Sequence, residues 1–109
     1  MKKLLFLLVI SILLTFTTAY AQGDIQVHFI DVGQGDSILV KISDSKAILI
    51  DAGIHSGADD PYNPFLYLKN KGVKTLDALF ITHPHDDHYG GLKYLCSKQG
   101  SKEFAVKAV

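Results

Sequence analysis

The segment His83-Pro84-His85-Asp86-Asp87-His88 decides how the rest of this chain is interpreted. It places three imidazoles and two carboxylates within one short stretch that is soon followed by Gly90-Gly91. Without a cation, adjacent carboxylates repel each other and crowded imidazoles resist protonation. A divalent metal ion removes both costs, because it binds neutral imidazole and ionised carboxylate. The segment therefore predicts a metal site rather than a polar loop with incidental histidines.

The spacing inside this segment indicates more than one metal-binding point. His83 and His85 are two residues apart, so their side chains point to the same side of an extended chain. Pro84 fixes φ between them and disfavours a helix. Asp87 and His88 follow within reach of a second point. Two cations ~3.5–4 Å apart are a known hydrolytic arrangement.

The flanking sequence predicts a strand, a loop and a helix around this segment. Residues 76–81 are mostly apolar and predict a buried strand that ends at Thr82. Residues 92–99 predict a helix that Gly100 ends. Ligands at the carboxyl end of a sheet strand are where α/β sites usually lie.

The stretch Thr82-His83-x-His85-x-Asp87-His88 resembles the T-H-x-H-x-D-H signature of the metallo-β-lactamase fold. By this resemblance, His83 and His85 bind a first metal ion. Asp87 and His88 contribute to a second one, and Asp87 is the catalytic residue. The cofactor that the resemblance implies is Zn²⁺, as one or two ions, with Mn²⁺ or Fe as alternatives.

A second stretch, Asp31-Val32-Gly33-Gln34-Gly35-Asp36-Ser37, lies between two β-rich segments. Residues 25–32 and 37–42 predict a β-hairpin, because two glycines around a polar residue suit a tight connection. The stretch resembles the opening hairpin of the ComEC-type branch of metallo-β-lactamase-fold hydrolases, which includes the nuclease-like domain of bacterial DNA-uptake proteins. The resemblance implies that the hairpin lies near the site, whereas the residues alone indicate only a turn.

Asp51 ends the short apolar strand predicted for residues 47–50. A carboxylate in this position needs hydrogen bonds or a cation, because burial without either is costly. By the resemblance, Asp51 is the first-motif aspartate of the family, which supports the metal loop from behind and does not bind metal. A plain cap or turn aspartate is the alternative.

Further local signals concern the helices. Asn63 as an N-cap and Pro64 in the first turn begin a helix that Gly72 ends. In the helix predicted for residues 92–99, Cys96 shares a face with two leucines, so we expect its thiol to be buried.

The charge balance shows no clear nucleic-acid-binding patch. The chain has no arginine, and its eleven lysines match its eleven acidic residues in number. Lysines at positions 69, 71 and 74 suit the carboxyl end of the predicted helix as a solvated face. A small-molecule or phosphodiester substrate remains compatible, because metal ions can supply the positive charge. No feature of the sequence indicates an oligomeric state.

Residues 1–21 have the three regions of a secretory signal peptide. A basic start is followed by an apolar run from Leu4 to Leu14 and by Ala19-Tyr20-Ala21. The apolar run is shorter than the ~20 residues that a membrane-spanning helix needs. We therefore expect Sec-type cleavage before Gln22, no stable membrane anchor afterwards, and a secreted or periplasmic mature protein. An uncleaved anchor is the alternative.

Residues 22–109 are predicted to form an α+β unit, the N-terminal half of a metallo-β-lactamase αββα sandwich. The resemblance covers nearly all of these residues. No His or Asp follows His88, so the family's later metal ligands have no counterpart here. We therefore expect a truncated, N-terminal part of a longer reading frame. A partner chain that completes the site is the alternative.

Three hypotheses on function follow. The first is that the intact protein is a secreted metal-dependent hydrolase that uses a metal-activated water, with phosphodiesters such as DNA favoured as substrates and β-lactams or thioesters second. The second is a non-catalytic metal-binding fragment, because one short loop could hold a single weak metal. The third is a purely structural secreted domain.

Overall fold

The computed structural model describes Met1 and residues 23–109, so nearly all of the predicted signal peptide lies outside the described residues. The described elements are, in chain order, β1 (Gln26–Phe29), β2 (Ile38–Ser43), β3 (Lys46–Ile50), α2 (Pro64–Asn70), β4 (Thr75–Leu76), β5 (Ala78–Phe80), α3 (Asp86–Tyr89), α4 (Leu92–Leu95), α5 (Gly100–Glu103) and β6 (Ala105–Val106). This mixture confirms the predicted α+β class. Over the described range, no helix combines the length and apolarity that crossing a membrane would require.

The main sheet has four strands in the order β1-β2-β3-β5. β1 and β2 form the predicted antiparallel hairpin, with Phe29 opposite Ile38 and Gln26 opposite Lys41. β3 is antiparallel to β2 and parallel to β5. Because β3 and β5 are parallel, the segments that follow them leave the sheet at the same end, the carboxyl end of both strands. The segment after β5 contains residues 83–88.

The prediction of one buried strand over residues 76–81 is wrong. The strand is divided into β4 and β5 at Asp77, whose carboxylate accepts the Ala47 N–H (3.0 Å) and the Lys107 ammonium (2.6 Å). Leu79 is buried, but Phe80 is 55% exposed because its side of the sheet is not covered. A short parallel pair, β4 with β6, extends this region.

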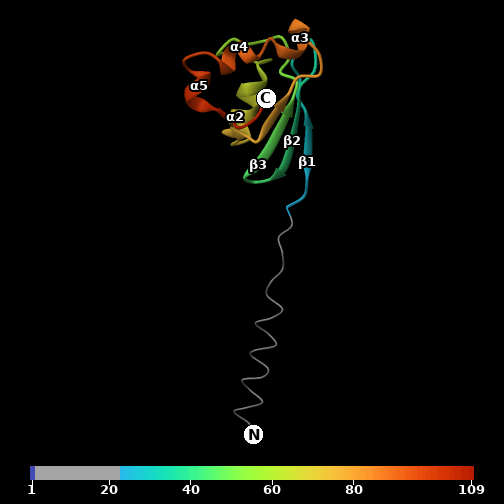
Figure 1. The fold of residues 1–109 in the computed structure, drawn as a ribbon, viewed down its shortest axis with the longest axis vertical. Coiled ribbons are helices and arrows are strands. Elements are labelled where there is room, and N and C mark those ends of the chain that lie inside the picture. Colours follow the sequence, from blue (N-terminus) through green and yellow to red (C-terminus); the bar gives the residue numbers. More distant parts are fainter. Residues whose placement is uncertain (2–22) are drawn as a thin grey trace.

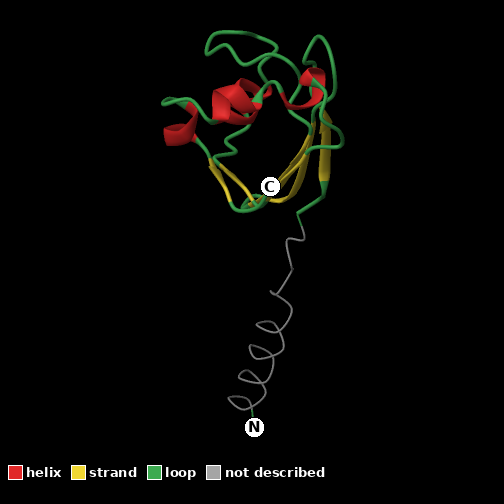
Figure 2. Ribbon diagram, turned by 45° about the horizontal axis from the view of Figure 1, so that its top comes forward, coloured by secondary structure: helices red, strands yellow, loops and turns green. Residues whose placement is uncertain are grey.

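The helices cover one face of the sheet, as Figures 1 and 2 show. Leu39, Leu49 and Leu79 point from this face into the core, and each is at most 1% exposed. Burying one such side chain contributes about 1.5–3 kcal/mol. They belong to one cluster with residues of the helical layer, Phe65, Leu68, Tyr94 and Phe104. The core therefore lies between the sheet and its helices.

The opposite face of the sheet is apolar and largely uncovered. The strand register places the following residues on it: Val27, Phe29, Ile38, Val40, Ile48, Ile50 and Phe80. We call this set the open apolar face. Val27 is 53% exposed and Phe29 is 79% exposed. Since the other face is apolar as well, the strands have the composition of a sheet that is buried on both sides.

Helix α2 follows its predicted signals, whereas the C-terminal helix does not. The Asn63 side chain accepts the Phe65 N–H (3.0 Å), and Gly72 follows the helix with φ +72°. The helix predicted for residues 92–99 is shorter than expected, because α4 ends at Leu95, and Gly100 begins a separate helix, α5, instead of ending one. A Cβ at Gly100 would lie 2.0 Å from the Tyr94 carbonyl oxygen, so the glycine permits the chain to fold back there.

The expectation that Cys96 is buried is also wrong. Cys96 is exposed, whereas Tyr94 is 2% exposed and takes the core position. The Tyr94 hydroxyl donates to a carboxylate oxygen of Glu103 (2.8 Å). Burial and this carboxylate together raise the pKa of Tyr94 to about 12.

Candidate metal centre

The metal loop, defined as residues His83–His88, lies where the segment after β5 turns into α3. Its first part is extended, since His85 has φ −109° and ψ +144° just before α3 begins. α3 is a single turn that carries Asp87 and His88. The strand, loop and helix predicted around this segment are therefore present, although the helix directly after the loop is one turn long.

The metal loop brings its imidazoles together. The ring centroids of His83 and His85 are 4.7 Å apart, and those of His83 and His88 are 3.8 Å apart. His83, His85 and Asp87 each offer a ligand atom, and these atoms lie within 4.8 Å of one another. Two imidazoles and a carboxylate are donors that Zn²⁺ accepts, so the residues fit a zinc ion. Their assignment as ligands stays a prediction.

His88 is held from behind by Asp51. The His88 Nδ1 lies 2.8 Å from Asp51 Oδ2, and both residues are buried, at 9% and 2% exposure. Its other ring nitrogen, Nε2, is 3.8 Å from Asp87 Oδ1. A histidine that donates Nδ1–H to a carboxylate leaves the Nε2 lone pair for a metal. This arrangement agrees with a supporting role for Asp51, which remains a prediction.

Thr82 completes the surroundings of the Asp51 carboxylate. Its backbone N–H donates to Asp51 Oδ1 (2.7 Å), and its hydroxyl donates to Asp51 Oδ2 (2.7 Å). Burial opposes ionisation of Asp51, but the Thr82 and His88 hydrogen bonds outweigh it and lower the pKa of Asp51. In turn, the hydrogen bond to Asp51 outweighs desolvation and raises the pKa of His88. Thr82 stands first in the T-H-x-H-x-D-H signature, but no role was predicted for it.

The main chain of Asp51-Ala52-Gly53, which we call the strap, fixes the metal loop. Asp51 has φ +59°, a left-handed conformation that aspartate tolerates better than most residues. The Ala52 N–H donates to the His88 carbonyl oxygen (2.6 Å), and the Gly91 N–H donates to the Gly53 carbonyl oxygen (3.0 Å). The strap therefore holds the metal loop through the backbone as well as through the Asp51 side chain.

The hairpin loop, defined as residues Gly33–Asp36, lies beside the same site. Asp36, Asp51 and His88 form a second group whose ligand atoms lie within 4.8 Å of one another. Asp36 Oδ2 is 3.8 Å from His88 Nδ1, and the Asp36 side chain is 70% exposed. The site-proximal hairpin that the resemblance implied is therefore present. Asp36 was not predicted as a site residue, because the G-x-G-D sequence alone indicates a turn.

The long loop after the strap contains a histidine–aspartate pair. His55 Nδ1 lies 2.6 Å from Asp60 Oδ2, and both side chains are partly buried. Their donor atoms do not join either of the two candidate metal groups found within the described residues.

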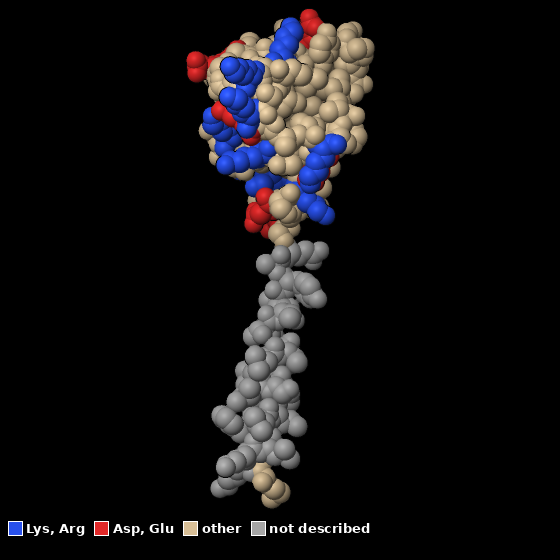
Figure 3. All heavy atoms as spheres, turned by 60° about the vertical axis from the view of Figure 1, so that its left-hand side comes forward, with Lys and Arg blue, Asp and Glu red and all other residues tan. Residues whose placement is uncertain are grey.

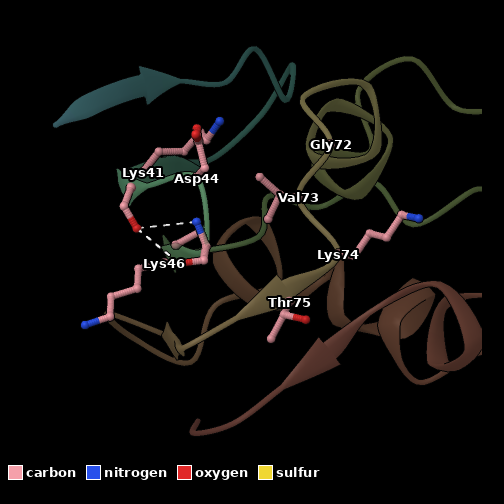
Figure 4. Close-up of a pocket in the computed structure, with 10 residues that line it drawn as sticks. Lys41, Asp44, Lys46, Gly72, Val73, Lys74 and Thr75 are labelled. Atoms are coloured by element: carbon pink, nitrogen blue, oxygen red, sulfur yellow. Dashed lines mark hydrogen bonds between the residues drawn. The ribbon is translucent and has the colours of Figure 1, made fainter. Parts of the chain in front are cut away.

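A hollow of about 270 Å³ lies at the other end of β3, between the β2–β3 turn and residues 72–75. The close-up in Figure 4 shows the side chains of Lys46 and Lys74 pointing away from each other. The two ammonium groups do not converge on one point, so the hollow does not form an anion-binding site. It is also separate from the metal loop.

Lysine side chains gather along one side of the described body, with acidic side chains among them (Figure 3). Two lysines form ion pairs, Lys69 with Glu103 (2.8 Å) and Lys107 with Asp77 (2.6 Å). That the chain lacks a clear nucleic-acid-binding patch stays a prediction.

Several known proteins are similar to this chain. ComE operon protein 3 of Bacillus subtilis (strain 168) is 34% identical over 95 residues, which are 74% of this chain and 12% of that protein. Integrator complex subunit 11 of Danio rerio is 39% identical over 74 residues, 64% of this chain and 12% of that protein. Ribonuclease J of Mycoplasma pneumoniae is 43% identical over 58 residues, 48% of this chain and 10% of that protein. The chain thus spans a small part of the length of these relatives. No solved structure matches it significantly.

A family model adds a match that extends over most of the described residues. It is described as the Metallo-beta-lactamase superfamily, and it matches residues 30–108. The matched region contains the hairpin loop, the strap and the metal loop. The chain therefore belongs to the metallo-β-lactamase superfamily.

Proposed function

We propose that the intact protein is a metal-dependent hydrolase that uses a metal-activated water to cleave phosphodiester bonds in a nucleic acid such as DNA. The observation that carries the proposal is the convergence of donor atoms from His83, His85 and Asp87 within 4.8 Å. The proposal concerns the activity of the whole protein, because the match covers only 12% of ComE operon protein 3 and of Integrator complex subunit 11.

Within this proposal the residues of the metal loop have distinct tasks. His83 and His85 would hold a first metal ion, and Asp87, whose carboxylate lies within 4.8 Å of their donor atoms, would contribute with His88 to a second ion in the same site. Zn²⁺ suits this donor set, and a bound ion would lower the pKa of a water molecule to ~7 and polarise the scissile phosphoryl oxygen. Asp51 keeps His88 oriented by accepting its Nδ1–H (2.8 Å). Asp87 is the catalytic residue in this assignment.

The choice of a phosphodiester substrate is supported by a relative and is compatible with the charge of the chain. Ribonuclease J of Mycoplasma pneumoniae, which is 43% identical over 58 residues, is by name a ribonuclease. The chain has no arginine, so the metal ions would supply the charge that stabilises the transferred phosphoryl group.

The test is hydrolysis by the purified complete protein. With Zn²⁺ or Mn²⁺ present, we expect it to cleave bis-p-nitrophenyl phosphate and single-stranded DNA or RNA, and to lose activity after treatment with a chelator. A β-lactam and a thioester serve as comparison substrates. Cleavage of either comparison substrate with none of the phosphodiesters would reject the phosphodiesterase assignment while keeping the metal centre.

We also propose that the protein acts outside the cytoplasmic membrane, because residues 1–21 have the composition of a signal peptide. Expressed with its own leader in a bacterium, the protein should be exported and should begin at Gln22. Mass spectrometry of the N-terminal peptide from the extracytoplasmic fraction measures this. A protein that retains Lys2 and Lys3 and stays in the membrane fraction would support an uncleaved anchor instead.

A further inference from the structure

We propose that Gly35 is a positioning residue for Asp87, because it lets the main chain of the hairpin loop lie directly against the main chain of the metal loop. The inference rests on the proposed function, since it concerns the same metal centre. It gives the hairpin loop a task that a turn between two strands does not itself require.

The contact between Gly35 and Asp87 leaves no room for a side chain. A Cβ built at Gly35 would lie 1.6 Å from the carbonyl oxygen of Asp87 and 2.5 Å from its carbonyl carbon. A carbon and an oxygen rarely approach closer than ~3.3 Å even in weak C–H···O contacts, so one of the two segments would have to move by roughly 1.5 Å. The opposing atoms are backbone atoms, so a rotamer change cannot relieve the clash.

The carbonyl of Asp87 accepts no helical hydrogen bond from Gly91, so it can lie against Gly35. The Gly91 N–H, which would close the next helical turn on Asp87, donates to the Gly53 carbonyl oxygen instead (3.0 Å). The next carbonyl, that of His88, accepts the Ala52 N–H (2.6 Å). Two successive peptide groups of the metal loop are thus positioned by two different segments, His88 by the strap and Asp87 by the hairpin loop.

Two hydrogen bonds connect the hairpin loop and the residue that follows it to the strap, so the loop is held in place against the main chain of Asp87. The Gly53 N–H donates to the Asp36 carbonyl oxygen (2.9 Å), and the Ser37 hydroxyl donates to the Asp51 carbonyl oxygen (3.0 Å). Metal sites need their ligands within about 0.5 Å of the productive position. A displacement of roughly 1.5 Å at position 87 would therefore separate Asp87 from its metal while His83 and His85 keep theirs.

The experiment compares Gly35→Ala with Gly33→Ala in the complete protein. Both glycines have positive φ, +92° and +69°, so both variants carry backbone strain. A Cβ at Gly33 would meet its nearest atom, on the Tyr62 ring, at an ordinary 3.5 Å. Gly33→Ala is therefore a matched control that has the strain without the clash with Asp87.

The readouts are Zn²⁺ affinity, measured by competition with a chelator, and the visible absorption of the Co²⁺-substituted protein. We expect Gly35→Ala to lower the Zn²⁺ affinity of the site that Asp87 contributes to by about 10–100-fold and to change the visible spectrum of the Co²⁺-substituted protein. Gly33→Ala should leave both close to wild type. In an Asp87→Asn background, Gly35→Ala should add little further loss, because both changes act through the same ligand.

The outcomes separate this inference from the proposed function. A wild-type protein that binds no metal would overturn the proposed function. Equal metal affinity in the Gly35→Ala and Gly33→Ala variants, in a wild type that binds metal, would overturn the inference alone. If Gly35→Ala fails to fold, a crystal structure of the zinc-loaded wild type decides. A separation of Gly35 Cα from the Asp87 carbonyl oxygen well beyond the ~4.5 Å of a contact would then overturn the inference.

Discussion

Replacing His83 and His85 together by alanine should abolish binding of the first metal ion and lower phosphodiesterase kcat/KM by about 10³-fold or more. A metal ion contributes several kcal/mol of transition-state charge stabilisation, and each 1.36 kcal/mol corresponds to about tenfold in rate. Neither histidine belongs to the hydrophobic core. The melting temperature of the metal-free protein should therefore stay close to wild type, while its metal content falls.

His55→Ala is the matched control for this double variant. His55 is a partly buried histidine that pairs with Asp60 and lies in neither candidate metal group. Elemental analysis of the purified proteins gives metal content, and initial rates give kcat/KM. Unchanged metal content in the double variant would show that the histidines of the metal loop do not bind metal, and the proposed mechanism would fail with it.

The second large effect is expected at Asp51. In Asp51→Ala, the Thr82 N–H, the Thr82 hydroxyl and His88 Nδ1 all lose their shared acceptor. Leaving the buried His88 Nδ1 donor without a partner costs about 1–3 kcal/mol, the part-buried Thr82 donors cost less because water can reach them, and alanine at φ +59° adds about 1–2 kcal/mol. Metal affinity should also fall by about 10–100-fold, because His88 is no longer oriented. Urea denaturation of the metal-free protein and Zn²⁺ competition measure the two effects.

Asp51→Asn separates the charge from the backbone conformation. Asparagine tolerates the left-handed region and keeps one oxygen for the Thr82 N–H, so its stability loss should be clearly smaller than that of alanine. Its metal affinity should still fall, because the amide nitrogen then takes the place of Oδ2 and cannot accept the His88 Nδ1–H. Asp44→Ala, at an exposed turn, is the control for a change of charge alone. If Asp51→Ala had the stability and metal affinity of that control, Asp51 would be an ordinary turn residue.

The parts of the fold that local sequence specifies were predictable. The hairpin of β1 and β2 follows from glycines between two β-rich segments, and α2 follows from Asn63, whose side chain caps the helix. The clustering of donors in the metal loop is also a local property, since all of them lie within residues 83–88.

The features that the sequence did not reveal depend on distant partners. β4 and β5 separate at Asp77 because its carboxylate meets Ala47 and Lys107, which are remote in sequence. The turn at Gly100 is an exception, because its partner, the Tyr94 carbonyl, is near in sequence; Cys96, between the two, is exposed. Thr82, which donates to Asp51 twice, could have been noticed from its place in the signature but not assigned a partner.

The open apolar face has a consequence for work with this segment in isolation. Phe29 and Phe80 stand 79% and 55% exposed on it, among aliphatic neighbours. Residues 22–109 expressed alone should aggregate through this exposed apolar surface and accumulate in inclusion bodies, whether or not the metal loop binds metal. Lysines at these two positions would improve colloidal solubility without touching a metal-binding donor or the buried core, and would make the segment accessible to spectroscopy.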